Sequence, residues 1–103
     1  MTTIAYRVIY SDDARDHLWD IEYYIIEAGE PQRANDFVAR IRQRCESLGT
    51  FPLRHRRRDD INNGLHVTGM EGKVTITYKV NERAKLVTIA GVYYGGVNWE
   101  AQP

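Results

Sequence analysis

The chain has 103 residues, of which 43% are hydrophobic and 27% charged, and its formal net charge is zero. These values predict one globular domain over residues 1–103. The sequence contains no run of about 18 apolar residues and no signal-peptide pattern, so we expect a cytoplasmic protein that enters no membrane. Its single cysteine excludes an internal disulfide, and with three scattered histidines it predicts neither a metal site nor a cofactor.

The neutral total hides an uneven distribution of charge along the chain. Residues 1–30 carry a net charge of −5, residues 31–58 carry +6, and the remainder carries −1. A basic face directed at an acidic partner is therefore compatible with zero net charge.

The N-terminal third predicts a strand followed by a helix. Ile4, Tyr6, Val8 and Tyr10 alternate with other residues and therefore share one side of a first strand. Ser11 fits a helix N-cap, and the apolar spacing after it predicts a helix over residues 12–28. The expected core face of that helix consists of Ala14, Leu18, Ile21, Ile25 and Ala28.

A second helix is predicted between Pro31 and Gly49, because proline favours a first helical turn and glycine favours a helix end. Its solvent side carries three arginines, which we expect to be solvated and partly paired with the acidic first helix: Arg33, Arg40 and Arg44. Its expected core face consists of Ala34, Phe37, Val38, Ile41, Cys45 and Leu48.

The remaining residues predict three short strands at about 64–69, 73–80 and 85–94. Glu71-Gly72 and Asn81-Glu82 lie where the two hairpin turns are expected. The order β-α-α-β-β-β predicts an α+β fold in which a helical hairpin packs on one face of a small, mostly antiparallel sheet.

The first helix carries a second apolar stripe, formed by Trp19, Tyr23 and Ile26, well over a right angle from its core face. The outer side of such a helix is normally polar. One interpretation is that the first strand or the C-terminal tail covers the stripe. The other is that the stripe binds a helix or extended segment of a partner, with the aromatic side chains as anchors.

Four arginines fall within five residues of the loop after the second helix: Arg54, Arg56, Arg57 and Arg58. Such a cluster is self-repelling unless a negative group binds to it. Nucleic acid, an acidic protein surface and the adjacent Asp59-Asp60 pair are all compatible with this requirement, as is a simply solvated charge run.

A nuclease would need a general base, a general acid and cations near the phosphate. His55, His66 and the loop arginines are the candidate groups, although His66 also fits a plain strand residue and Tyr78 a buried one. The sequence shows no triad, glycine-rich phosphate loop or metal cluster, so we predict no catalytic residues.

Taken together, these segments resemble the ParE branch of the ParE/RelE toxin superfamily over nearly the whole chain. The sharpest segment is the ending Tyr94-Gly95-Gly96-Val97-Asn98-Trp99-Glu100, because ParE-like chains commonly finish in a strand, a Gly-Gly pair and an aromatic-acid pair. Other matching segments are Ser11-Asp12-Asp13-Ala14, Ile21-Glu22-Tyr23-Tyr24-Ile25, Pro31-Gln32-Arg33-Ala34, Leu48-Gly49-Thr50-Phe51-Pro52, Gly64-Leu65-His66 and Tyr78-Lys79-Val80.

The resemblance implies a non-enzymatic toxin that binds DNA gyrase, stalls it on broken DNA and blocks replication. It also implies a ParD-like antitoxin, whose ribbon-helix-helix dimer binds the operator. We therefore interpret the stripe of Trp19, Tyr23 and Ile26 as a candidate antitoxin surface. The candidate residues facing gyrase are Arg54, Arg56, Arg57, Arg58, Tyr94 and Trp99.

The RelE branch offers the alternative, a ribosome-dependent endoribonuclease that cleaves messenger RNA. The closing strand of RelE-like chains usually carries an arginine, whereas Ala90-Gly91-Val92 at the equivalent place carries no cation. This difference favours the gyrase branch. A third alternative is a toxin fold that has lost its activity and serves as an interaction module.

Overall fold

The computed structural model describes residues 5–101 of the chain. The helices are α1 (Asp12–Glu27) and α2 (Pro31–Ser47), with single 3-10 turns at Pro52–Arg54 and Trp99–Ala101. The strands are β1 (Arg7–Tyr10), β2 (Arg56–Arg57), β3 (His66–Met70), β4 (Val74–Asn81) and β5 (Leu86–Tyr94). Within this range, neither helix is long and apolar enough to cross a membrane.

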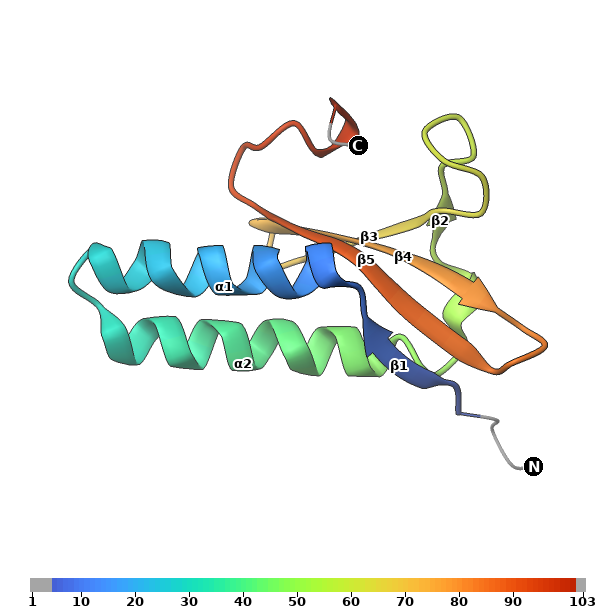
Figure 1. Ribbon diagram of the computed structural model, residues 1–103, viewed down its shortest axis with the longest axis horizontal. Helices are drawn as coiled ribbons and strands as arrows, with labels where there is room; N and C mark the ends of the chain where they lie inside the picture. Colours follow the sequence, from blue (N-terminus) through green and yellow to red (C-terminus); the bar gives the residue numbers. More distant parts are fainter. Residues whose placement is uncertain (1–4, 102–103) are drawn as a thin grey trace.

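The five strands form one sheet in the order β1-β5-β4-β3-β2. β1 runs parallel to β5, and the other neighbouring pairs are antiparallel. The α1–α2 hairpin covers one face of the sheet, and the C-terminal segment, drawn in red, curls back over the other (Figure 1). This arrangement confirms the predicted α+β fold.

The core lies between the helical hairpin and the sheet, and the predicted apolar faces supply it. Every residue expected on the core face of α2 is buried, as are four of the five expected on α1. The exception is Ala28, which is the exposed C-cap of α1. The predicted inward residues of β1 contact the core as expected, except Ile4, which lies outside the described residues.

Ser11 joins the start of α1 to the sheet. Its hydroxyl accepts a hydrogen bond of 3.0 Å from the backbone N–H of Ala14 and so caps the helix, as predicted. The same hydroxyl donates to the carbonyl oxygen of Ala90 at 3.1 Å. The pairing of β5 with β1 ends at Ile89, so the carbonyl oxygen of Ala90 has no partner in β1. The Ser11 hydroxyl provides that partner at the edge of β5.

Two predictions about arginines are wrong. Arg56 and Arg57 form the short strand β2 on β3, where a loop was expected. The arginines of α2 do not pair with α1. Instead, Arg40 binds Glu71 in the β3–β4 turn at 2.8 Å, and Arg44 donates to the hydroxyl of Thr68 at 2.8 Å. These contacts fasten α2 to the sheet.

Candidate partner-binding surfaces

The apolar stripe on α1 is open to solvent. Trp19 is 70% exposed, Tyr23 58% and Ile26 41%, so neither β1 nor the C-terminal segment covers them. The three side chains and Glu22 enclose a shallow hollow of about 50 Å³. A surface of this kind, with two large aromatic side chains around a small hollow, has the features of a protein-binding site.

Carboxylates flank this stripe, which begins beside the exposed ion pair of Arg15 and Asp12. Asp16, Glu22 and Glu27 lie on the same side of α1, and none of them forms an ion pair within the described part of the chain. The stripe therefore combines apolar anchors with a negative rim, which favours a partner with apolar and basic side chains.

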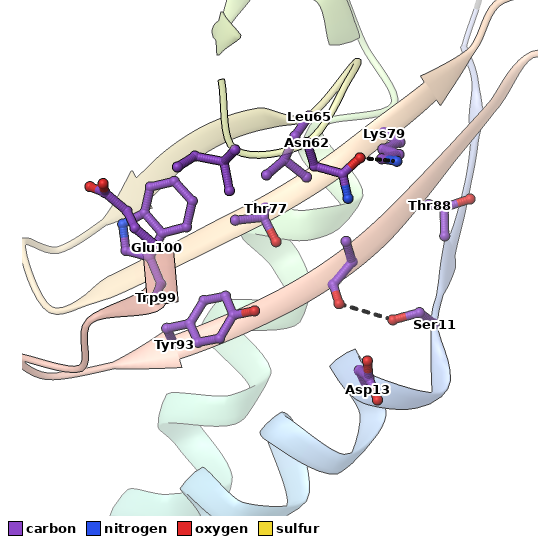
Figure 2. A pocket seen from close by; sticks show the side chains of 12 residues that line it. Ser11, Asp13, Asn62, Leu65, Thr77, Lys79, Thr88, Tyr93, Trp99 and Glu100 are labelled. Atoms are coloured by element: carbon purple, nitrogen blue, oxygen red, sulfur yellow. Dashed lines mark hydrogen bonds between the residues drawn. The ribbon is translucent and has the colours of Figure 1, made fainter. Parts of the chain in front are cut away.

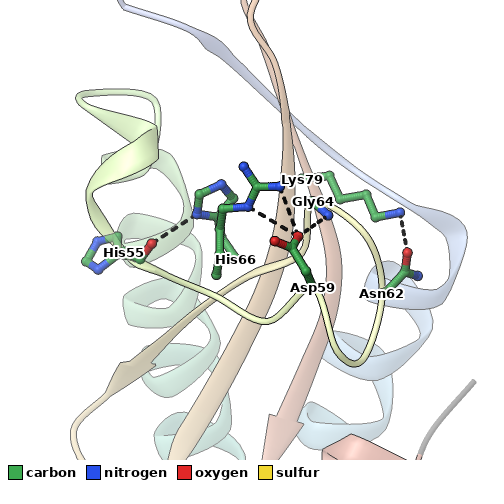
Figure 3. A network of polar contacts seen from close by, with 7 residues as sticks. His55, Asp59, Asn62, Gly64, His66 and Lys79 are labelled. Carbon is green, nitrogen blue, oxygen red and sulfur yellow. Dashed lines mark hydrogen bonds and ion pairs between the residues drawn. The ribbon is translucent and has the colours of Figure 1, made fainter.

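The basic loop, residues 54–58, is partly neutralised by the two carboxylates that follow it, Asp59 and Asp60. Arg57 donates two hydrogen bonds to one oxygen of Asp59, at 2.9 and 3.2 Å. The same oxygen accepts the backbone N–H of Gly64 at 2.8 Å (Figure 3), and together these bonds lower the pKa of Asp59. The turn that follows β2 is thereby closed on itself, and Lys79 holds its far side through Asn62 at 2.8 Å.

Arg58 is turned inward and holds the C-terminal segment. It binds Asp60 with two hydrogen bonds, at 2.8 and 2.9 Å, and Glu100 with one at 3.3 Å. Its guanidinium carbon lies 5.5 Å from the ring centre of Trp99. The side chain is only 15% exposed, so Arg58 joins the basic loop to the chain end.

The candidate residues facing gyrase do not form a single surface. Arg54 and Arg56 are exposed and have no carboxylate partner within residues 5–101. Trp99 lies with Arg58 on the sheet face that carries no helices. Tyr94 lies on the opposite side, where its ring centre is 5.3 Å from that of Phe37 in α2. The structure thus brings Arg58 and Trp99 together and separates Tyr94 from them.

The two histidines of the nuclease alternative have structural roles. His66 is 3% exposed and stacks on Tyr78 with ring centres 5.1 Å apart. Its Nδ1 lies 3.0 Å from the carbonyl oxygen of His55. The Nε2 of His55 accepts a hydrogen bond from Arg54 at 3.2 Å, and burial and nearby arginines lower its pKa. The predicted burial of Tyr78 and Cys45 is confirmed.

Sequence reasoning missed a cleft on the sheet face opposite the helices (Figure 2). Its volume is about 540 Å³, and its walls are the turn after β2, the start of α1 and the C-terminal segment. The available signal was the pair Thr75 and Thr77, which alternate with the buried Val74, Ile76 and Tyr78 along β4. The described residues contain no group of histidine, cysteine and acidic side chains that would hold a metal ion.

Comparisons with known proteins agree with this architecture. A chain of the toxin–antitoxin complex RelBE2 from Mycobacterium tuberculosis superposes with a TM-score of 0.67 at 20% sequence identity, over 93% of this chain and 98% of that one. A chain of the chromosomal ParDE system from P. aeruginosa superposes with a TM-score of 0.75 at 15% sequence identity, over 90% of this chain and 99% of that one. At these identities the likeness establishes the fold.

A comparison with curated protein sequences found no match. The sequence model of the ParE toxin of the type II toxin–antitoxin system parDE matches residues 8–99, which include every helix and strand except the first residue of β1. The chain therefore belongs to the ParE family and is a toxin of a type II toxin–antitoxin system.

Proposed function

We propose that the protein inhibits DNA gyrase and so blocks replication in the cytoplasm, and that a ParD-like ribbon-helix-helix antitoxin holds it inactive. Membership of the ParE family over residues 8–99 is the observation that carries this proposal. The protein acts by binding, without a catalytic step of its own, and it reaches DNA only through gyrase or through the antitoxin.

The outer side of α1 is assigned to the antitoxin. Trp19, Tyr23 and Ile26 are all exposed and together line one hollow on α1. An amphipathic helix or extended segment would bury these side chains and leave its basic residues beside Glu22 and the other carboxylates.

The basic loop is assigned to the contact with gyrase. The contacts that each arginine already makes within the chain determine whether it can bind gyrase directly. Arg54 and Arg56 are available to an acidic partner surface, whereas Arg57 must exchange its bond to Asp59. Arg58 acts indirectly, because it positions Trp99 and Glu100. Tyr94 contributes through packing on Phe37.

A supercoiling and DNA-cleavage assay with purified gyrase tests the proposal. We expect the protein to reduce supercoiling and to trap double-strand breaks, and a cognate ParD-like antitoxin to reverse both effects. Normal supercoiling at micromolar protein would contradict gyrase inhibition. Cleaved messenger RNA in cells that express the protein would instead support the endoribonuclease alternative.

A further inference from the structure

The sheet face opposite the helices is a shallow trough with a floor of small side chains. Two hollows lie on it, of about 540 and 360 Å³, and both are lined by Trp99 and Glu100. The C-terminal segment therefore bridges the trough and leaves space on each side. The floor residues are Gly69, Thr75, Thr77, Thr88 and Ala90.

One side of the larger hollow is built around Tyr93. Gly91 makes room for its ring, since a Cβ atom at Gly91 would lie 2.5 Å from the Tyr93 hydroxyl oxygen. His17 supports the other side, with ring centres 4.9 Å apart. The imidazole is itself fixed, because its Nδ1 accepts the backbone N–H of Val92 at 3.1 Å. The hydroxyl of Tyr93 consequently points toward that of Thr77 at the floor of the hollow (Figure 2).

The lining has the chemistry of a peptide-binding site. Hydroxyl groups both donate and accept hydrogen bonds, so those of the half-buried Thr88 and Tyr93 match the alternating N–H and C=O groups of an extended backbone. Ile61, Leu65 and Trp99 provide an apolar wall for a side chain. A volume of about 540 Å³ lies within the range of pockets that bury a ligand.

The rim of the trough carries charges of both signs. Asp13 and Lys79 lie on opposite sides of the mouth (Figure 2), and neither forms an ion pair within the described residues. The carboxylate of Glu100 lines both hollows. Arg56 and Arg58 line the smaller hollow, where Arg58 is paired with Asp60 and Glu100. A rim with both signs of charge suits a peptide of mixed charge better than a uniformly negative chain of phosphates.

The C-terminal segment has the features of a strap that opens. It leaves β5 at Gly95, where φ is +72°, and Gly96 is also exposed. Its side-chain contacts to the rest of the chain include the ion pair and ring contact made by Arg58. Both contacts lie on the sheet face opposite the helices, away from the core.

We propose that this trough binds a short extended peptide segment of a protein partner, with one bulky apolar side chain in the larger hollow and the C-terminal segment closed over it. Only the identity of the partner rests on the proposed function, in which the basic loop beside this trough is assigned to gyrase.

The test is a selection from a displayed library of short random peptides with the full chain carrying Trp19→Phe. In that background Trp99 is the sole tryptophan, so its fluorescence reports events in the trough. Gly69→Arg fills the smaller hollow from an exposed position, and Gly91→Ala displaces the ring of Tyr93. Asn35→Arg, on the exposed side of α2, is the matched control.

We expect enriched peptides that change Trp99 fluorescence and that lose at least about tenfold in affinity for each trough variant but not for Asn35→Arg. Circular dichroism shows whether each variant is folded. If Gly91→Ala is unfolded, the affinity of Gly69→Arg by itself tests the proposal. Three results would overturn the proposal: no enriched peptide, equal affinity for all variants, or displacement of the peptides by a single-stranded oligonucleotide. Gyrase is not used, so a failure here is distinct from a failure of gyrase inhibition.

Discussion

The guanidinium carbon of Arg58 lies 5.5 Å from the centre of the Trp99 ring, so the basic loop and the chain end hold each other across the sheet. The same guanidinium binds Glu100 at 3.3 Å. Two segments that are far apart in the sequence therefore form one surface whose shape depends on a single side chain.

Glu100→Gln should loosen the C-terminal segment with little effect on the core. We expect hydrogen exchange at residues 96–101 to accelerate several-fold, because the charged partner of Arg58 is lost. The free energy of unfolding should change by less than about 1 kcal/mol, as for other surface ion pairs. Glu30→Gln, which removes the ion pair with Arg33, should leave that exchange unchanged. Unaltered exchange in Glu100→Gln would show that the segment is held by other contacts.

Trp19→Ala should weaken antitoxin binding by about 2 kcal/mol or more, since Trp19 is the most exposed of the anchors. Its thermal stability should stay close to that of the parent, because the side chain packs on little else. Isothermal titration calorimetry with the antitoxin measures the difference. Tyr24→Ala, an exposed aromatic on another side of α1, is the control and should retain affinity. Equal losses in both variants would mean that the stripe is not the anchor.

The double variant Arg54→Gln with Arg56→Gln should reduce gyrase inhibition at least several-fold, because it removes the two loop arginines that have no carboxylate partner in the described chain. Antitoxin affinity should not change. Arg33→Gln with Arg40→Gln removes the same charge from α2 and should leave inhibition intact. Undiminished inhibition by the loop variant would remove the loop from the proposed gyrase contact.

Tyr78→Phe should destabilise the protein by about 1–3 kcal/mol. The hydroxyl of Tyr78 donates a buried hydrogen bond of 2.7 Å to the carbonyl oxygen of Pro52, and its loss leaves that oxygen unsatisfied. Urea unfolding measures the difference. Tyr10→Phe is the matched control, because its bond to Glu46 is long, at 3.5 Å, and exposed. A similar shift in both variants would contradict the structural role given to Tyr78.

Stability should fall as the pH decreases from about 7.5 to 5.5. Burial and the positive charges of Arg44 and Arg54 lower the pKa of His55 below its ordinary value of 6.5. Between the two pKa values the unfolded chain binds more protons, so the stabilisation is complete above pH 6.5 and is lost as the pH falls toward the folded pKa. Urea midpoints at the two pH values measure it, and His55→Gln should reduce the difference. An unchanged difference in that variant would assign the effect to another group.

The sequence was sufficient to predict the core, because apolar periodicity on α1, α2 and β4 directly reflects which side is buried. It was insufficient for β2, since two arginines carry no apolar alternation. The strand forms through its backbone pairing with Val67 and His66.

The side of Tyr94 could not be predicted for a local reason. The β4–β5 ladder shifts register between Thr77 and Tyr78. Ile89 and Val92 both face the core, so the alternation is broken between them and Tyr94 turns toward the helices. Strict alternation from Ile89 would have placed Tyr94 outside, beside Trp99. The contact between Arg58 and Trp99 could not be predicted either, because the sequence alone does not show which side chains far apart in the chain are in contact.

The order of the strands has a consequence for synthesis of the toxin. β5 is translated last among the strands, yet it lies between β1 and β4 and pairs with both. A nascent chain that lacks β5 cannot join its first strand to the rest of the sheet or close its core. The sheet of the toxin is therefore completed only after β5 has been synthesised, whereas both helices precede it in the chain.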